Sequence, residues 1–309
     1  MAASNHDTII LANEASEALG RRIAQCLDFP FTRVQKKFFT DGEIYHAFPE
    51  DIAGRDVVIV GATHNDQSHL ELIDLIDGCH YYRARTVNVV IPFLGYSTME
   101  QAKPDSNEIP KGITRTRQIF RARPDFVAFI DLHSEAVLHA HQGDVQTLHI
   151  NTTNLIVQKI RELQLGNFVL VSPDYGRSKW VARLAGQLNA PHTAADKDRY
   201  AMDKTMVHQV ASVVKDKLVI ICDDMIRTGG SIIQTAQRCR EAGARDTILF
   251  ATHLVLAGQS RQKFKDHGIG KIIGADTYPG VESDELLDVF SVAPLVASTL
   301  KRHLGAVAK

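Results

Sequence analysis

Short apolar segments recur along the chain and alternate with longer segments whose apolar residues have helical spacing. The short segments are rich in Val and Ile, which is typical of buried strands. The longer ones repeat apolar residues every three or four positions, which predicts amphipathic helices. The predicted strands are 8–12, 56–62, 86–93, 125–132, 168–174, 217–224, 247–255 and 271–276, and the predicted helices are 16–27, 70–84, 153–163, 180–188 and 232–244. This alternation predicts an α/β fold with mostly parallel sheets flanked by helices.

The two halves of the chain share one order of predicted elements. A single offset of 161 residues (191 − 30) aligns them without gaps, pairing Leu27 with Leu188, Pro30 with Pro191, Val57 with Leu218 and Thr86 with Thr247. Two α/β stretches can also agree partly by chance, but a match across most of each half favours duplication. We therefore expect two domains of one ancestral fold, residues 1–150 and 151–309.

Composition limits the partners that such a protein can attract. The chain has 35 Lys and Arg against 36 Asp and Glu, a formal charge of −1, so it has no general field for nucleic acid or anionic membranes. Its four cysteines have no short pair spacing, which is unlike a zinc site or a disulfide framework. The N-terminal residues do not resemble a signal peptide, and no apolar run reaches membrane-spanning length. We expect a cytoplasmic protein with small-molecule substrates.

One stretch, residues 220–231 with the sequence IICDDMIRTGGS, runs from an apolar strand through two acids into a glycine loop before a helix. A loop at a helix N-terminus directs free backbone N–H groups and the positive end of the helix dipole at its ligand. Gly229 and Gly230 allow close backbone approach, and Thr228 and Ser231 add hydroxyl donors. The loop therefore favours a phosphate, although its spacing is not that of a Walker loop.

The adjacent acids, Asp223 and Asp224, need a different ligand, because carboxylates repel phosphate. Carboxylates accept hydrogen bonds from vicinal hydroxyls and also bind Mg²⁺. Together with the loop they indicate a ribose that carries a phosphate at one end. The alternative is a glycine turn capped by Ser231 with two solvated acids. The corresponding stretch of the first half, GATHNDQSHL (61–70), lacks both the acids and the paired glycines.

The stretch 222–231 resembles the phosphoribosyl-diphosphate-binding motif of phosphoribosyltransferases and of the ribose-phosphate pyrophosphokinase family. The tandem architecture selects the pyrophosphokinases, which have two phosphoribosyltransferase-like domains and keep the motif only in the second. Other stretches match in the order of that family: FFTDGE (38–43), IPFLGY (91–96), DLHSE (131–135), VSPDYG (171–176), DKDRY (196–200) and ATHLVLAG (251–258). The resemblance covers nearly the whole chain.

The resemblance implies transfer of the β,γ-diphosphate of ATP to the anomeric hydroxyl of ribose 5-phosphate, which releases AMP. It assigns ribose 5-phosphate binding to Asp223, Asp224, Arg227, Thr228, Gly229, Gly230 and Ser231. It assigns the cations that stabilise the transition state to Lys197 and Arg199. The alternative for residues 196–204 is a solvated charged hairpin.

The resemblance also assigns ATP binding to Phe39, Asp41, Glu43 and His133, with Phe39 stacked on adenine. His133 and Asp174 would contact the Mg²⁺ that accompanies ATP. In the family the FFTDGE loop serves the active site of a neighbouring subunit, which implies a homo-oligomer, a dimer building a hexamer; a simple surface turn is the alternative. We interpret His139, His141 and His149 as solvated or capping residues, because their spacing matches no known metal site.

The chain departs from the best-known class of this family at three places. Residues 97–101 (STMEQ) replace an Arg-Gln-Asp-Arg run that grips ATP, Arg227 replaces a third acid, and Arg177 and Lys179 replace small apolar residues. These features are closer to plant-type class II enzymes, which implies weak control by phosphate and ADP. The alternatives for function are a phosphoribosyltransferase, which would need a base-binding hood, and a non-catalytic regulatory subunit of a synthetase complex.

Overall fold

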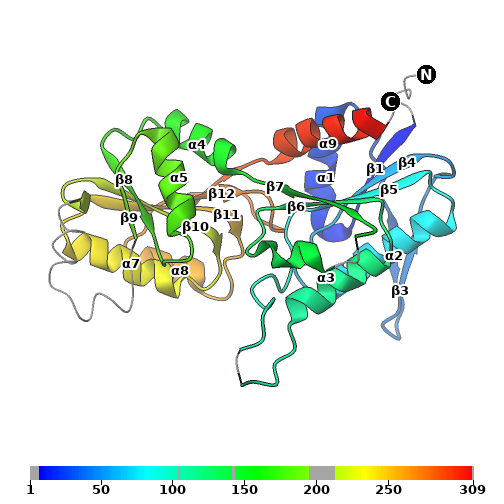
Figure 1. The fold of residues 1–309 in the computed structure, drawn as a ribbon, viewed down its shortest axis with the longest axis horizontal. Coiled ribbons are helices and arrows are strands. Elements are labelled where there is room, and N and C mark those ends of the chain that lie inside the picture. Colours follow the sequence, from blue (N-terminus) through cyan, green and yellow to red (C-terminus); the bar gives the residue numbers. More distant parts are fainter. Residues whose placement is uncertain (1–6, 104, 141–142, 195–212, 308–309) are drawn as a thin grey trace. The chain divides into compact units, whose positions relative to one another are not determined.

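A computed structural model of the chain describes residues 7–103, 105–140, 143–194 and 213–307 (Figure 1). It divides into two compact units, and each contains one parallel sheet with helices packed on it. The first unit comprises residues 1–151, 277–280 and 291–309, and the second comprises 152–276 and 281–290. The predicted α/β class with parallel sheets is confirmed.

The first unit is built on a five-stranded sheet with the order β1-β4-β5-β6-β7, in which every neighbouring pair is parallel. A separate antiparallel hairpin, β2–β3, projects from it. The elements are β1 (Thr8–Ala12), η1 (Glu14–Ser16), α1 (Glu17–Leu27), β2 (Gln35–Phe38), β3 (Ile44–Ala47), β4 (Asp56–Val60), α2 (Asp66–Tyr81), β5 (Thr86–Ile91), α3 (Lys111–Arg121), β6 (Phe126–Ile130), η2 (Glu135–His139), β7 (Gln146–Ile150) and α9 (Ala293–Val307).

The second unit is built on a six-stranded sheet with the order β13-β12-β11-β10-β8-β9, also parallel throughout. Its elements are α4 (Thr153–Glu162), β8 (Phe168–Ser172), α5 (Ser178–Leu188), β9 (His192–Ala194), β10 (Leu218–Ile226), α7 (Gly230–Glu241), β11 (Asp246–Leu254), α8 (Ser260–Asp266), β12 (Ile272–Ala275) and β13 (Leu287–Phe290).

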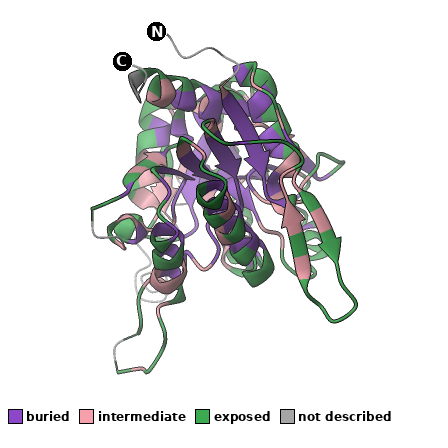
Figure 2. Cartoon of the chain, turned by 90° about the vertical axis from the view of Figure 1, so that its right-hand side faces the viewer, coloured by how far each residue is buried: buried purple, intermediate pink, exposed green. Residues whose placement is uncertain are grey.

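The alternation of side chains along each strand decides which helices cover which face of a sheet. In β10, Val219 and Ile221 pack with residues of α7, whereas Ile220 and Cys222 pack with residues of α4 and α5. In the first unit, Val57 and Ile59 of β4 share a core with Leu72, Leu75 and other residues of α2. Figure 2 shows the central strands of the parallel sheet of this unit as buried, and the β2–β3 hairpin and the outer faces of the helices as largely exposed or intermediate.

The internal repeat predicted from the sequence has a counterpart in backbone hydrogen bonds, whose acceptors are 161 positions apart and whose donors are 160 positions apart (170 − 10). Pro30 accepts from the backbone N–H of Ile10 at 2.9 Å, and Pro191 accepts from that of Leu170 at 3.0 Å. Helices α1 and α5 both end at a left-handed residue, Asp28 and Asn189. The two residues are again separated by 161 positions (189 − 28), so the two halves repeat the same turn between helix and strand.

The hydrophobic pattern did not predict strands β2, β3, β7, β9 and β13. None of these strands has more than one buried residue. A strand at a sheet edge or in a projecting hairpin buries too little side-chain surface to need a continuous apolar run. The FFTDGE stretch, for which a simple turn was the alternative, is therefore the tip of a hairpin.

The final helix, α9, belongs to the first unit, which differs from the predicted division at residue 150. It packs against α1. The His303 ring stacks on Phe126 of β6 with 3.7 Å between ring centroids, and its Nε2 lies 3.2 Å from the side-chain oxygen of Asn88. The sequence did not predict that the chain returns to the first unit in α9, because the apolar face of a helix does not identify the element that it packs against.

Candidate functional site

The predicted sugar phosphate site lies at the carboxyl end of the sheet of the second unit. Strands β8 and β10 are parallel neighbours, with Val171 opposite Ile221. Asp174 follows the end of β8 by two residues, and Asp223 and Asp224 lie in the last part of β10. Ligands of open α/β sheets bind at this edge. The structure therefore brings Asp174 close to the two acids predicted from the motif.

Asp224 is almost fully buried and is paired with Arg177. The Arg177 Nε donates to Oδ1 of Asp224 at 3.1 Å, and an Nη lies 2.5 Å from Oδ2. Such a two-pronged guanidinium contact fixes the orientation of a carboxylate. Arg177 directly precedes α5. This helix packs on the face of β10 that carries the side chain of Cys222. The sequence identified Arg177 only as a departure from the family pattern. The structure shows that its partner is Asp224.

Asp223 has no such guanidinium partner within the part of the chain that the structure describes. The backbone N–H of Asp224 donates to its Oδ1 at 2.8 Å. Burial raises the pKa of Asp223 well above its usual range, and the negative charges of Asp224 and Asp174 add to this rise. Bringing a cation or hydroxyl donors to this carboxylate would favour its charged form. This arrangement of carboxylates therefore suits a ligand that supplies positive charge or hydrogen-bond donors.

Asp174 is exposed and shapes the turn after β8. Its Oδ1 accepts from the backbone N–H of Arg177 at 3.1 Å, and its carbonyl oxygen accepts from the Ser172 hydroxyl at 2.6 Å. The residues that the structure describes contain no group of three or more His, Cys, Asp or Glu side chains arranged to hold a metal ion. Asp174 offers the oxygen ligand that Mg²⁺ prefers.

The glycine loop leads directly into α7. Gly229 has a φ of +81°, in the left-handed region. A Cβ at this position would lie 2.3 Å from the Phe264 ring of α8. A Cβ at Gly230 would meet nothing within 4 Å. The loop is therefore closely packed at Gly229 and has open space beside Gly230. No side chain caps α7, which leaves its N-terminal amides for a ligand.

Backbone contacts with residues that follow β11 support the same loop. The backbone N–H groups of Leu256 and Ala257 donate to the carbonyl oxygens of Ile226 and Arg227, at 2.9 and 3.0 Å. Residues 251–258 are one of the stretches that resemble the family, and two backbone contacts from this stretch hold the glycine loop. Arg227 and Thr228 are exposed, Ser231 is partly buried, and all three lie in or directly after the loop.

The corresponding helix of the first unit, α2, has a side-chain cap at its N-terminus. Asn65 caps α2, and its side-chain oxygen accepts from the backbone N–H of Ser68 at 2.8 Å. A capped N-terminus has fewer free amides for an anion. The loss of the motif from the first half thus has a structural counterpart.

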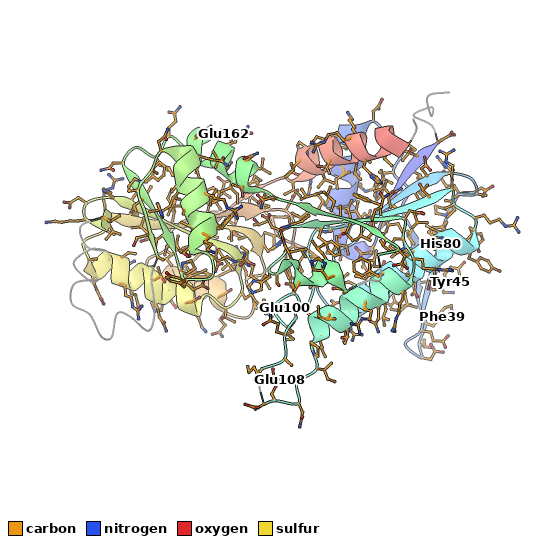
Figure 3. All side chains as sticks on the ribbon, in the orientation of Figure 1. Phe39, Tyr45, His80, Glu100, Glu108 and Glu162 are labelled. Carbon is orange, nitrogen blue, oxygen red and sulfur yellow. The ribbon has the colours of Figure 1, made fainter. Side chains whose placement is uncertain are left out.

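The predicted nucleotide residues Phe39, Asp41 and Glu43 lie at the tip of the β2–β3 hairpin. The Phe39 backbone N–H donates to the Glu43 carbonyl at 2.9 Å, and Asp41 Oδ1 accepts from the Glu43 N–H at 3.1 Å. Figure 3 shows Phe39 and Tyr45 on the hairpin. They are 43% and 50% exposed, which is unusual for aromatic rings of a folded chain and provides a surface on which a base could stack.

His133 lies in the loop after β6, and that loop is held by His149. The backbone N–H of Leu132 donates to His149 Nε2 at 3.0 Å, so the ring carries its proton on Nδ1, which lies 2.7 Å from Glu135 Oε1. His149 therefore orders the backbone beside His133. His133 belongs to the first unit and Asp174 to the second, and Lys197 and Arg199 lie outside the described residues.

Two cations that the sequence did not single out lie beside Tyr96, before the altered loop. Arg115 of α3 and the Tyr96 hydroxyl both donate to Oδ1 of Asp66 at 2.9 Å. These contacts hold the pKa of Asp66 below its usual range, the Tyr96 hydrogen bond being the larger cause. Lys111 Nζ lies 5.1 Å from the centroid of the Tyr96 ring. No local motif connects α3 with Tyr96.

Comparison with known proteins identifies the family. Residues 8–112 match the sequence model of the N-terminal domain of ribose phosphate pyrophosphokinase, and residues 143–279 match that of the phosphoribosyl transferase domain. A ribose-phosphate pyrophosphokinase of Gloeobacter violaceus is 32% identical over 95% of this chain and 89% of its own length. The chain belongs to the ribose-phosphate pyrophosphokinase family. The resemblance inferred from the motifs is thereby confirmed.

Further relatives of the same family match both halves. A ribose-phosphate pyrophosphokinase of Nostoc is 31% identical over 96% of this chain and 91% of its own length. The crystal structure of phosphoribosylpyrophosphate synthetase from Mycobacterium smegmatis aligns with a TM-score of 0.86 and 28% identity, covering 97% of this chain and 99% of that one. These matches do not favour the two alternative functions. Among the described residues, no helix is long and apolar enough to cross a membrane.

The two adjacent acids should affect stability in opposite directions. Asp223 binds its proton more tightly when folded than when unfolded, so stability falls as pH rises above about 3.9, the usual pKa of an aspartate. We expect Asp223→Asn to raise or preserve the melting temperature at pH 7.5 and to flatten its dependence on pH. Asp224→Asn should cost about 1–3 kcal/mol, because it leaves Arg177 without its partner. Thermal unfolding of both variants from pH 5 to 8 measures this; a lower melting temperature for Asp223→Asn would contradict it.

The paired glycines provide a matched test of the loop. Gly229→Ala places a methyl group against the Phe264 ring at a left-handed position, whereas Gly230→Ala meets open space. We expect Gly229→Ala to weaken ribose 5-phosphate binding at least about tenfold, or about 1.4 kcal/mol. Titration calorimetry with ribose 5-phosphate compares the two. Equal affinities would show that the tight side of the loop does not shape the site.

Proposed function

We propose that this chain is a ribose-phosphate diphosphokinase that forms phosphoribosyl pyrophosphate and AMP from ribose 5-phosphate and ATP. The observation that carries the proposal is the meeting of three carboxylates with an uncapped glycine loop at one sheet edge, in a chain that matches the family over both halves. The carboxylates suit the hydroxyls of a ribose, and the loop suits its phosphate.

The 5-phosphate is assigned to residues 227–231 and the N-terminal amides of α7. Phosphate oxygens would accept from the loop amides and from the hydroxyls of Thr228 and Ser231. The left-handed Gly229 sets the course of the backbone there, and the contacts from Leu256 and Ala257 keep the loop in place. Arg227, a permanent cation in this loop, would contribute to binding the anionic substrate or product.

The ribose hydroxyls are assigned to Asp223 and Asp224. Arg177 holds Asp224 in one orientation, so its oxygens need no reordering when the sugar binds. Asp223 would regain its charge when hydroxyl donors or a cation arrive, since its raised pKa reflects burial and like charges. Binding of the sugar would therefore strengthen as pH rises through the pKa of Asp223.

In the reaction, the anomeric oxygen forms a bond to the β-phosphorus of ATP. The bond from that phosphorus to the oxygen shared with the α-phosphorus breaks, AMP leaves with this oxygen, and the hydroxyl proton passes to solvent. Negative charge gathers on the bridging oxygens, so positioned cations contribute more than a strong base. By family resemblance, Lys197 and Arg199 supply these cations.

Magnesium would accompany the ATP phosphates and neutralise their charge. Asp174 fits such an ion, because it offers an exposed carboxylate at the edge of the site. His133 is the second residue assigned to this ion by resemblance, and it is the poorer fit because Mg²⁺ prefers oxygen ligands.

The nucleotide is assigned to the hairpin tip, with adenine stacked on Phe39 and with Asp41 and Glu43 beside it. Exposed aromatic rings on a projecting hairpin suit a role toward a second subunit, as the resemblance implies. We propose a homo-oligomer, a dimer building a hexamer, in which this hairpin completes a neighbouring site. Cytoplasmic location remains a prediction from the sequence.

The reaction itself is tested by incubating the purified protein with ATP, Mg²⁺ and ribose 5-phosphate and measuring AMP and phosphoribosyl pyrophosphate. We expect both products in equal amounts. Lys197→Ala should lower kcat by about a hundredfold or more, as expected when one cation is lost from the transition state. Lys301→Ala, an exposed lysine on α9, should match the parent. A parent without AMP release would refute the function, and an unchanged Lys197→Ala would refute the catalytic assignment.

A class II character is tested by the response to inorganic phosphate. Arg227 in place of an acid, together with Arg177 and Lys179 after β8, is the basis for this assignment. We expect the rate in phosphate-free buffer to be within about twofold of the rate with added phosphate, a difference of about 0.4 kcal/mol. ADP should inhibit only by competing with ATP. Strict dependence on phosphate would place the chain with class I.

A further inference from the structure

A pocket of about 450 Å³ lies in the first unit at the base of the β2–β3 hairpin. Its charged lining consists of Glu14, Glu17, Arg33, Lys36 and Glu71, and Phe31 and Phe38 are among its apolar walls. None of these residues belongs to the site assigned above. The pocket is therefore a feature that the proposed reaction does not explain.

The sequence repeat relates two residues of this pocket to two residues assigned to the site of the second half. Glu14 follows the end of β1 by two residues, as Asp174 follows the end of β8 by two. The offset of 161 residues that aligns the two halves pairs Lys36 with Lys197 (197 − 161) in the sequence. Glu14 and Lys36 of the pocket are therefore related to Asp174 and Lys197 by sequence spacings of 160 (174 − 14) and 161 residues, whereas Asp223 and Asp224 align with Ala62 and Thr63, which do not line the pocket.

In the first unit, however, the lysine is already bound to carboxylates. Lys36 Nζ lies 2.5 Å from Glu14 Oε2 and 3.1 Å from Glu71 Oε2. Burial alone would lower the pKa of Lys36, but the hydrogen bonds that Lys36 donates to Glu14 and Glu71, together with the charges of these acids, outweigh burial and raise that pKa. Glu71 is 4% exposed, and its second oxygen accepts from the Glu14 backbone N–H at 3.0 Å. Lys36 is thus a charged residue held by two acids.

The facing strand of the hairpin meets the same helix. His46 of β3 lies directly opposite Lys36 in the hairpin register. Its ring nitrogens lie 3.9 Å from Glu71 Oε1 and 3.7 Å from Asp74 Oδ2, and both acids belong to α2. Each strand of the hairpin therefore has one basic side chain directed at carboxylates of α2.

The pocket is poorly suited to a charged small molecule. Its three carboxylates outnumber Lys36 and Arg33, and Arg33 Nε lies 3.1 Å from Glu17 Oε2, so both cations have partners. A phosphate would meet this negative excess, and the nearby α2 is capped by Asn65. The ion pairs are therefore better explained by a role in holding the structure together than by a role in binding a charged ligand.

We propose that Lys36 and Glu71 are positioning residues for the nucleotide: this ion pair fastens the β2–β3 hairpin to α2 and thereby sets the place of Phe39, Asp41 and Glu43. The inference rests on the proposed role of the hairpin tip in ATP binding. An isolated two-stranded hairpin is at best marginally stable in water, so it needs an anchor to present its tip in one orientation. The ion pairs of Lys36 with Glu14 and Glu71 provide that anchor.

The test compares Lys36→Met, which removes the charge, with Lys36→Arg, which keeps it. We expect Lys36→Met to raise the KM for ATP about tenfold, or about 1.4 kcal/mol, and to leave the KM for ribose 5-phosphate within about twofold. Amides of residues 35–47 should exchange with deuterium faster, while those of β4 and β5 should not change. Lys36→Arg should resemble the parent, and Lys301→Met is the control for an exposed lysine of the same unit.

A second variant guards against misfolding. Lys36→Met leaves Glu71 buried without its lysine, whereas Lys36→Met with Glu71→Gln removes both charges and should fold as the parent does. The double variant should still show the higher KM for ATP and the faster exchange of the hairpin. Parent-like exchange and KM in either folded variant would overturn the proposal. A parent that forms no AMP would instead refute the proposed function, and hairpin exchange would still decide whether the ion pair is an anchor.

Discussion

The structure of the candidate site depends on one electrostatic constraint: two neighbouring carboxylates at the end of a buried strand require compensation. Arg177 compensates Asp224, and none of the described cations forms such a pair with Asp223, whose pKa is raised by burial and by the charges around it. Keeping like charges close costs stability in the free protein. The proposed sugar substrate, rich in hydroxyls and brought with a cation, would relieve that cost, so the feature that lowers stability would favour binding.

The two halves show how one fold came to use the same sheet edge in two ways. In the second unit, Gly229 leaves the N-terminus of α7 without a side-chain cap, and acids end the central strand. In the first unit, Asn65 caps α2, and Lys36 is bound by Glu14 and Glu71. The start of α7 has no side-chain cap, whereas the start of α2 is capped and Lys36 has carboxylate partners. Duplication allows this difference, because only one copy needs to keep the glycine loop that is assigned to the substrate.

Much of the candidate site follows from local sequence. The positions of Asp223, Asp224 and residues 227–231 at a strand end and a helix start could be predicted, because hydrophobic periodicity locates both elements and glycine pairs mark the turn. The hairpin that carries Phe39 could not be predicted, since its strands are mostly exposed and lack a continuous apolar run. The resemblance pointed to Phe39, Asp41 and Glu43 without showing that they form its tip.

The sequence by itself determined the α/β class, the internal repeat, the family and the loop that suits a phosphate. These properties depend on the spacing of apolar residues and on a few glycines and acids that are close together in the chain. Only the tertiary structure decided that Arg177 pairs with Asp224, that Lys36 pairs with Glu71, and that α9 returns to the first unit. The partners in these contacts are far apart in the chain, and a charged or apolar side chain does not encode which distant partner the fold will bring to it.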